Sequence, residues 1–465
     1  MGTKGSRGRA GTGRSRSSRG ARSRSARYPK LKPGPGRSAE DVAAHQRARL
    51  QEALIDLVAE HGYNAVAVAT LSECARVSKR DFYKHFDSKE ECFLATYDLI
   101  VSRSVRGILA ATEGEEDWCK RLRLGFLTFA DQIADRPERA RLALVEAFAA
   151  GALAVERMQR TNRLFEALVA KNLLRADGAP QLPGLVVKGI VAGGSRLARA
   201  RLLSGHPRRL ALDGGELMEW ALCFCDDEAV RLGDLRLTAT LPPPRTVAEV
   251  PLEDERALIL AATAKLASEN GYATLTAPRV RAAAGVSKRS FDAHFDGVAD
   301  CFLATLETLS GRTLATVAPQ YIAADDWASG VCRMIVGLCQ RLACDPTFAS
   351  LAFLEVFSPG PEAIRWRSEM IAKLARRLRR EAPPKQRPSE FAAEASIGAM
   401  WGVIHHFVAT GRGAQLPLAA PVLSYIALAP ALGGAAAIDV IVANAGEDGG
   451  GPARARPVGA SGASR

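Results

Sequence analysis

The feature that most constrains the fold of this chain is an internal repeat. The segment RVSKRDFYKHF, residues 76–86, returns in altered form as GVSKRSFDAHF at residues 285–295. Matching residues differ in number by 209 (271 − 62), and they include Gly62 and Gly271, His85 and His294, Trp118 and Trp327, Phe148 and Phe357, and Gly193 and Gly402. A gapless match over about 150 residues indicates a duplicated domain and not a short solenoid repeat.

Both copies show the residue spacing of helices. Leu50, Leu54 and Leu57 fall on one helical face, and Gly62 follows where a left-handed cap is expected. The second copy repeats this pattern before Gly271. Patterns that alternate apolar and polar residues, as strands do, are scarce. The predicted fold class is therefore all-α, built as a tandem duplication.

Length and local composition predict the domain organisation. A chain of 465 residues favours two to four domains, and three consecutive prolines at 242–244 favour an extended linker. In chain order we expect a disordered Arg-rich tail at 1–40, a first helical copy at 41–240, a linker at 241–252, a second helical copy at 253–443 and a disordered tail at 444–465.

The net charge of +13 is concentrated at the N-terminus. Residues 1–39 hold 12 of the 63 Lys and Arg residues and no Asp or Glu, so the remaining 51 basic and 50 acidic side chains nearly cancel. Any basic surface of the folded part must therefore be local. Four interpretations of the tail stay open: a cationic arm for nucleic acid, a solubilising tail, a wrongly assigned start codon, and an organelle transit peptide.

Cysteine usage and hydropathy indicate the compartment. The nine cysteines include no C-x-x-C pair and lie mostly in apolar segments, which is typical of a reducing compartment. The chain has no uninterrupted apolar run of about 18 residues and no apolar signal core at its start. We expect a protein that is neither membrane-spanning nor secreted, located in the bacterial cytoplasm and associated with the nucleoid.

Residues 68–86 have the pattern of a helix-turn-helix. A short helix is expected from about Val68, a turn near Arg76, and a second helix from Ser78, whose hydroxyl suits a helix N-cap. The apolar residues spaced to face inward are Leu71, Val77, Phe82 and Phe86. A period of 3.6 then turns a polar set outward, which is Lys79, Arg80, Tyr83 and Lys84. Such a face suits phosphates and guanine edges in a major groove.

These segments resemble the TetR-type transcriptional regulators. The resemblance lies in the run from Gly62-Tyr63 through VSKRDFYKHF and DSKEECF, and again from Gly271-Tyr272 through AGVSKRSFDAHF and DCFLATLE. It implies, in each copy, a three-helix DNA-binding head followed by a helical body that senses a small molecule and dimerises. The first head is then expected at 41–92 and the first body at 93–240, the second head at 253–301 and the second body at 302–443. The first copy departs from the family pattern in having Arg76 where the turn glycine is usual.

The second copy has diverged on its outward face. It carries Asp292 in place of Tyr83 and Ala293 in place of Lys84, so it gains a carboxylate that phosphates repel. We expect the first head to be the main DNA reader, and the sequence leaves open whether the second head binds DNA. The residues expected to contact DNA are Ser78, Lys79, Arg80, Tyr83, Lys84, His85, Lys89, Lys288, Arg289 and His294.

Metal binding and catalysis are not predicted. His85 and His294 are interpreted as phosphate contacts or packed side chains, because no further His or Cys lies at ligand spacing. The sequence holds no P-loop, G-x-S-x-G, H-E-x-x-H or dinucleotide fingerprint. We therefore expect no enzyme and no cofactor.

Two late helices are rich in small residues. Gly189 and Gly193 in one body, and Gly398 and Gly402 in the other, let a second helix come close. The family resemblance implies dimerisation through the last two helices of a body. Two interpretations stay open: the bodies dock within one chain as an internal pseudo-dimer, or the glycines serve packing inside each body. A homodimer is the alternative assembly.

A ligand pocket is expected in the bodies, although no sequence pattern locates it. The candidate lining residues are Trp118 and Arg196 in the first body and Trp401, His405 and His406 in the second. The leading hypothesis is a TetR-type repressor that binds a double-stranded DNA operator and is released or modulated by an unknown small molecule. The alternative is an architectural DNA-binding protein driven by the Arg-rich tail.

Overall fold

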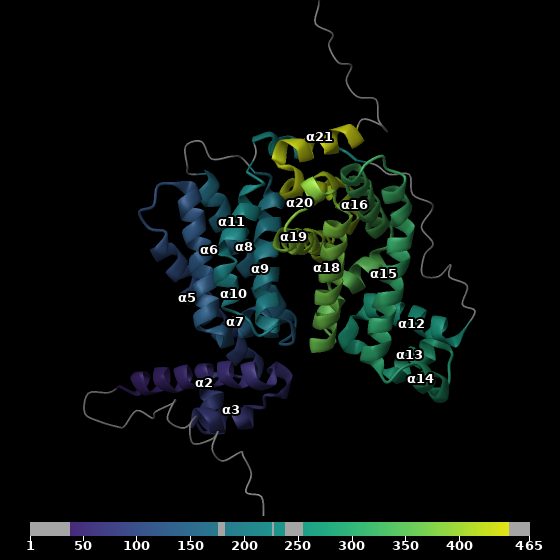
Figure 1. Ribbon diagram of the computed structural model, residues 1–465. Coiled ribbons are helices and arrows are strands. Elements are labelled where there is room, and N and C mark those ends of the chain that lie inside the picture. Colours follow the sequence, from purple (N-terminus) through teal and green to yellow (C-terminus); the bar gives the residue numbers. More distant parts are fainter. Residues whose placement is uncertain (1–37, 175–181, 226, 238–253, 446–465) are drawn as a thin grey trace, which may run out of the picture. The chain divides into compact units, whose positions relative to one another are not determined.

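The regular elements of the described chain are helices. The computed structural model describes residues 38–174, 182–225, 227–237 and 254–445, and within these ranges it contains no strand (Figure 1). The all-α prediction is confirmed. The predicted linker, and almost all of the two predicted tails, lie outside the described residues.

The chain divides into two compact units, one ending at Ser102 and the other beginning at Arg103. The first unit holds α2 (Ala39–His61), the 3-10 helix η1 (Tyr63–Ala65), α3 (Val68–Ala75), α4 (Lys79–His85) and the start of α5 (Lys89–Ala111). These helices form the first head.

The second unit holds the rest of the first copy and the whole of the second. The first body continues with α6 (Trp118–Asp135), α7 (Pro137–Leu144), η2 (Glu146–Phe148), α8 (Ala152–Leu174), α9 (Gly184–Leu203), α10 (Arg209–Leu212), α11 (Gly214–Leu222) and η3 (Asp227–Gly233). The second head comprises α12 (Glu255–Asn270), η5 (Tyr272–Thr274), α13 (Ala277–Ala284) and α14 (Lys288–His294). The second body comprises α15 (Val298–Ile322), α16 (Trp327–Cys344), α17 (Pro346–Phe353), η6 (Glu355–Phe357), α18 (Pro361–Glu381), η7 (Pro384–Gln386), α19 (Glu390–Ala409), η8 (Gly413–Ala419), α20 (Ala420–Leu432) and α21 (Gly434–Ala445).

Local sequence explains where the first helix begins and ends. Ser38 and Asp41 form a capping box, in which each side chain accepts a hydrogen bond from the backbone N–H of the other. At the other end Gly62 has φ 79° and its N–H donates to the Val58 carbonyl. The predicted helix end at Gly62 is confirmed. A residue with a Cβ is disfavoured at that φ, so glycine suits this position. The predicted apolar face of α2 is buried against the rest of the head.

The second head is joined to its body by direct contacts. The backbone N–H of Tyr272 donates to Glu355 Oε2 at 2.8 Å, and the Tyr272 ring meets the Phe302 ring edge-on at 5.0 Å. Helix α12 also packs on α15 and α17. Head and body of the second copy are therefore continuous within the second unit.

The two bodies pack against each other through α9 and α19. A Cβ added at Gly402 would lie 2.2 Å from the Ala192 Cβ, and one added at Gly193 would lie 2.9 Å from the Ala395 carbonyl oxygen. Glycine is therefore needed where these matching helices of the two copies cross. Gly402 therefore serves docking between the bodies. Gly193 serves both of the roles left open by the sequence, because a Cβ there would also lie 2.5 Å from the Trp220 ring of its own body.

Side chains of the last helices extend this interface. Trp220 Nε1 donates to Ser396 Oγ at 3.0 Å, and the Tyr425 hydroxyl donates to the Phe224 carbonyl at 3.3 Å. Phe148 and Phe357, which occupy matching positions in the two copies, stack with ring centroids 4.1 Å apart. Stacking of a residue on its own counterpart is the contact expected at a pseudo-two-fold axis.

One stretch, Gly413–Leu432, is long and apolar enough to cross a membrane by length and composition, with a mean hydropathy of 1.5. About two thirds of that window, 67%, is buried inside the protein. The core helix of a soluble protein has the same character, so the stretch is weak support for a membrane span.

Candidate functional site

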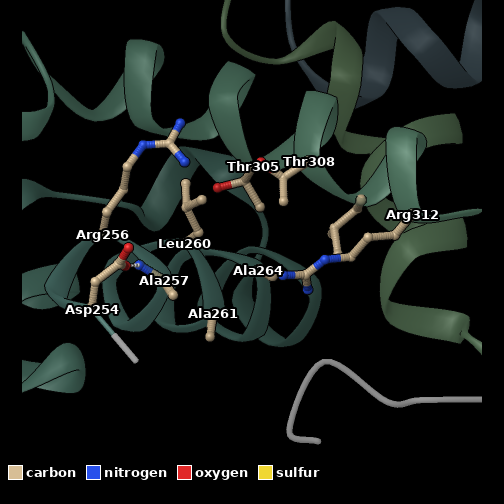
Figure 2. A pocket seen from close by; sticks show the side chains of 10 residues that line it. Asp254, Arg256, Ala257, Leu260, Ala261, Ala264, Thr305, Thr308 and Arg312 are labelled. Carbon is tan, nitrogen blue, oxygen red and sulfur yellow. Dashed lines mark hydrogen bonds between the residues drawn. The ribbon is translucent and has the colours of Figure 1, made fainter. Parts of the chain in front are cut away.

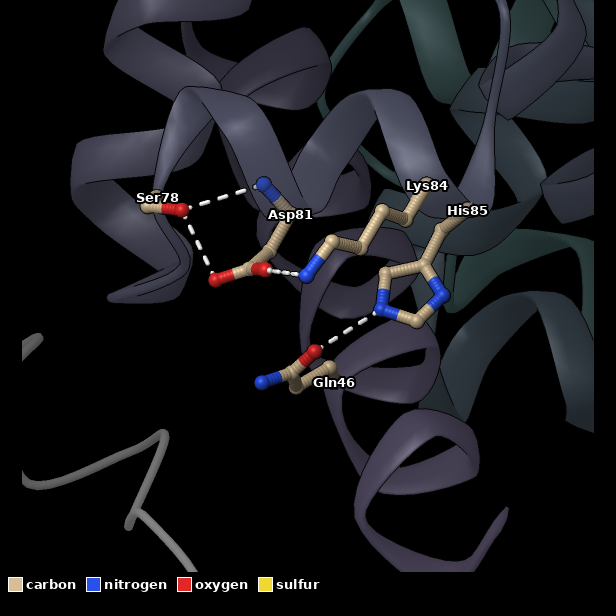
Figure 3. Close-up of polar contacts among 5 residues, drawn as sticks. All are labelled: Gln46, Ser78, Asp81, Lys84 and His85. Carbon is tan, nitrogen blue, oxygen red and sulfur yellow. Dashed lines mark hydrogen bonds and ion pairs between the residues drawn. The ribbon is translucent and has the colours of Figure 1, made fainter. Parts of the chain in front are cut away.

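The first candidate site is the exposed face of α4, the second helix of the helix-turn-helix. Ser78 caps this helix: its Oγ accepts from the Asp81 N–H at 3.0 Å and donates to Asp81 Oδ2 at 2.7 Å (Figure 3). Phe82 is completely buried and Tyr83 is 56% exposed. Lys79 and Arg80 are exposed as well. The predicted inward and outward faces of this helix are confirmed.

Lys84 lies on the same exposed face but is already paired. Its Nζ donates to Asp81 Oδ1 at 2.7 Å (Figure 3). The hydrogen bonds from Lys84 and then Ser78 lower the pKa of the Asp81 carboxyl. Exposed pairs of this kind are weak, so Lys84 can exchange Asp81 for a phosphate at little cost.

His85 is held against the first helix of the head. Its Nε2 lies 2.8 Å from Gln46 Oε1, which can only accept, so Nε2 carries the proton (Figure 3). Burial, and then the charge of Arg47, lower the pKa of the imidazole. The structure thus places His85 as a half-buried, packed side chain, one of the two roles expected for it.

Lys89, which the sequence assigns to the DNA face, turns its ammonium group toward the backbone. Nζ donates to the carbonyls of Tyr63 and Val66, both at 3.0 Å, and lies 4.0 Å from the centre of the Tyr63 ring. An ammonium group has three donors. At most one remains for a phosphate, so the contacts seen here brace the 3-10 turn of the head.

Arg47 is a residue of this site that the sequence did not single out. It is exposed, its Nη1 donates to the His85 carbonyl at 3.3 Å, and its guanidinium lies 4.5 Å from the centre of the Phe86 ring. The second head repeats the arrangement with Arg256 at 5.7 Å from the Phe295 ring. The signal in the sequence was the matching Arg in both copies.

Arg76 lies in the turn before α4, and its backbone has a left-handed conformation with φ 53°. Such a φ is costly for a residue with a Cβ. Arg49, which is buried, donates from Nη2 to the Arg76 carbonyl at 3.2 Å and so supports the turn. The second copy has Gly285 at this position with φ 68°.

The recognition helix of the second head, α14, has a different exposed face. Ser287 caps it by accepting from the Ser290 N–H at 3.0 Å. Lys288 and Arg289 are exposed at its start, and they are followed by exposed Asp292 and Ala293. His294 is exposed too. Two cations of the predicted set are therefore presented together with a carboxylate.

A cavity of about 210 Å³ lies between α12 and α15 of the second copy (Figure 2). Asp254, Arg256 and Arg312 are its charged residues, and its remaining wall is mainly apolar. Asp254 Oδ1 already accepts from the Ala257 N–H at 2.6 Å as the N-cap of α12. The sequence did not predict this cavity.

A second cavity, of about 100 Å³, lies between the two bodies and is called the interface cavity below. Trp401, His405 and His406 line it, so three of the five predicted pocket residues come together there. Arg196 does not line it: its Nη2 donates to the Ser368 carbonyl at 3.2 Å and lies 3.3 Å from Glu394 Oε1. Trp118 lies at the start of α6, after the N-cap Asp117.

Histidines of the interface cavity are neutral at pH 7. Burial is the main cause that lowers the pKa of both His405 and His406 to about 4. Arg412 Nη2 lies 2.8 Å from His406 Nε2, and since a guanidinium only donates, this nitrogen accepts. Across the described ranges, no three His, Cys, Asp or Glu side chains gather to hold a metal ion.

Together, capped recognition helices braced by buried aromatic residues define a helix-turn-helix DNA-binding protein. Residues 50–96 and 259–305 each match the family of bacterial regulatory proteins described as the tetR family. Each copy of the duplicated domain thus holds one segment that matches the TetR family.

Several solved structures are similar to part of the chain. The fatty acid degradation regulator FadR from Bacillus halodurans is 17% identical, over 41% of this chain and 97% of that chain, with a TM-score of 0.36. A TetR-like transcriptional regulator from Rhodococcus sp. RHA1 is 18% identical, over 38% and 96%, with a TM-score of 0.33. FadR from Bacillus subtilis, in complex with stearoyl-CoA, is 13% identical, over 37% and 96%, with a TM-score of 0.35. No curated protein matches the chain.

Proposed function

We propose that this protein is a ligand-responsive transcriptional repressor whose first head reads most of the operator. The observation that carries the proposal is the exposed face of α4, where Lys79, Arg80 and Tyr83 are free of the core while Phe82 anchors the helix. Lysine and arginine on a recognition helix supply phosphate contacts and guanine readout, and an exposed tyrosine adds a hydrogen-bonding group.

The second head contributes less to specificity. Lys288 and Arg289 can reach phosphates, but Asp292 stands where the first head has Tyr83, and its carboxylate repels the DNA backbone. The His294 side chain is exposed on the same helix. We propose that this head holds DNA loosely, mainly through phosphates.

Docking of the two bodies supports an operator that is asymmetric. A dimer of single-headed chains reads two identical half-sites, so its operator tends to be palindromic. Here the contacts expected of a dimer join two unlike copies within one chain, through α9 and α19. One half-site is then strongly specified by the first head and the other weakly by the second.

Footprinting on the DNA that flanks the protein's own gene tests the proposal, with the full chain and with a variant lacking residues 1–39. A regulator keeps a sequence-specific footprint without the tail, and the footprint has one strongly and one weakly specified half. An architectural protein, the alternative function, loses most of its binding when the tail is removed.

Light scattering of the free protein completes the test. A monomer in solution with an asymmetric footprint agrees with the internal pseudo-dimer. A strict dimer that binds a perfect palindrome through two first heads contradicts it, and leaves the second copy as a sensor or dimerisation module.

A further inference from the structure

The interface cavity is built from both bodies. Helices α8 and α9 and the 3-10 helix η2 line it from the first body, and η6, α18 and α19 line it from the second. Its volume is about 100 Å³. A single water molecule needs roughly 10 to 15 Å³ of such space, so the cavity accommodates a small organic molecule.

Positive charge dominates the lining. The cationic side chains are Arg163, Lys188, Arg199 and Arg367, whereas Glu166 is the single carboxylate among the described residues that line the cavity. Glu166 is already engaged, since its Oε2 accepts from Lys188 Nζ at 2.6 Å. Glu166 is therefore not available to Arg367, which lines the same cavity.

Arg367 is the most unusual of these cations because it is buried. It is 4% exposed, and its Nε has no hydrogen-bond partner among the described residues. Its guanidinium lies 4.9 Å from the centre of the Phe357 ring and 5.1 Å from that of Trp401. Ring faces offset part of the cost of burial, but a buried charge normally requires an anionic partner as well.

The surroundings of Arg367 make this cost larger. Burial, followed by the nearby charges of Arg199 and Arg196, lowers the pKa of its guanidinium well below the usual value. A second buried donor of the lining, Trp401 Nε1, likewise has no partner in the described part of the chain. Two buried donors on one wall therefore need an acceptor that the described protein does not supply.

An apolar wall lies close to these donors. Phe148 and Phe357 stack on each other and both line the cavity, as do Met158 and Val191. Met158 occupies the position in the first copy that Arg367 occupies in the second (367 − 158 is again 209). The duplication has thus placed a cation on one side of the cavity and an apolar side chain at the matching position on the other.

We propose that the interface cavity is the effector site and binds a small organic anion, whose carboxylate or phosphate group pairs with Arg367 while its apolar part contacts the stacked phenylalanines. The inference deepens the proposed function and rests on it. Because residues of both bodies line the cavity, a bound anion joins them and screens the repulsion between Arg199 of one and Arg367 of the other. Binding there is coupled to the packing of α9 on α19.

Calorimetric titration of the full chain tests the site, with benzoate and inorganic phosphate as probes and benzyl alcohol as the neutral counterpart of benzoate. We expect benzoate, phosphate or both to bind and benzyl alcohol to bind at least ten-fold more weakly. Which anion binds distinguishes a carboxylate effector from a phosphate effector. Arg367→Gln should weaken the anion at least ten-fold.

Two further variants test whether the loss of anion binding is specific to the buried donors of the cavity. Arg365→Gln is the matched control, because Arg365 lies on the same helix but its side chain is 63% exposed and paired with Glu362. It should leave the affinity within about two-fold, as expected for an exposed pair. Trp401→Phe keeps the ring and removes only the Nε1 donor, and it should weaken the anion several-fold.

The outcomes separate the inference from the proposed function. Absence of anion binding, anion binding unchanged in Arg367→Gln, or benzyl alcohol that binds as tightly as the tighter anion overturns the inference and makes Arg367 a packing residue. The operator affinity of the same protein, measured by fluorescence anisotropy with and without the anion, should change in the wild type and not in Arg367→Gln. Anion binding that leaves operator affinity unchanged overturns the effector role, whereas a wild type without sequence-specific DNA binding overturns the proposed function itself.

Discussion

The two heads have kept the same interior and changed their exposed faces. Phe82 and Phe291 are 0% and 1% exposed, so the aromatic anchor of each recognition helix is the same. Outside, Tyr83 of the first head is replaced by Asp292 in the second. Each head must bury its core to fold, whereas only a head that reads DNA needs a cationic face.

Polar contacts beside the recognition helix have diverged as well. In the first head Gln46 pairs with His85, whereas the matching Glu255 of the second head accepts from the Ser290 hydroxyl. His294 is left exposed. Two positions differ between the heads here, since Glu255 matches Gln46 and Ser290 matches Asp81, and together they change which side chain of the recognition helix is held.

The largest expected effect tests the shared interior. Phe82→Ala and Phe291→Ala should each reduce the stability of their own head by about 3 to 5 kcal/mol, since both remove a fully buried ring. Hydrogen exchange measured by mass spectrometry on the full chain reports each head separately. Protection unchanged in α3 and α4, or in α13 and α14, would mean that the helix orientation inferred from these rings is wrong.

The next effect tests the exposed faces. Replacing Tyr83 and Lys84 together by Ala should weaken operator binding more than ten-fold, about 1.4 kcal/mol or more, because both side chains lie on the exposed face of α4. Asp292→Ala, the matched change in the second head, should not weaken binding. Mobility shifts with the same operator measure both. A silent first pair would show that the roles of the heads have been assigned the wrong way round.

A smaller effect compares the two turns. Gly285→Ala should destabilise the second head by about 1 kcal/mol, because its φ of 68° suits glycine and disfavours a Cβ. Arg76→Gly should relieve the same strain in the first head, with a gain of about 0.5 kcal/mol, since glycine also gains freedom in the unfolded chain. Hydrogen exchange of the flanking helices gives both values. A neutral Gly285→Ala would indicate that this turn is not strained.

The smallest effect is a pH dependence confined to the first head. The pKa of His85 is lowered in the fold, so unfolded chains bind the proton more readily. The stability that neutral His85 contributes is present above its unfolded pKa, about 6.5, and is lost as the pH falls through the folded value. Hydrogen exchange of α4 between pH 7.5 and about 5 should show loss of protection. The variant His85→Gln should lose less, and an equal loss would exclude His85 as the cause.

Much of this protein follows from its sequence alone. The duplication, the helical class, the helix end at Gly62, the cap at Ser78 and the burial of Phe82 were all predicted, and the structure has each of them. These features depend on residues within a few positions of one another, where backbone geometry and helical period decide the outcome. For the same reason, the burial of Phe82 predicts which side chains of α4 are exposed.

Tertiary structure decided the features that join distant segments. Lysine is a residue type that commonly contacts DNA phosphates. The Lys89 ammonium group nevertheless donates to the carbonyls of Tyr63 and Val66, because α5 places it beside the 3-10 turn. Arg367 looks in the sequence like one of many arginines on a basic helix. Only the packing of α18 and α19, and of one body on the other, buries it between Phe357 and Trp401 in a cavity with no carboxylate left for it. Burial and charge pairing depend on neighbours far away in the chain, and no local pattern encodes them.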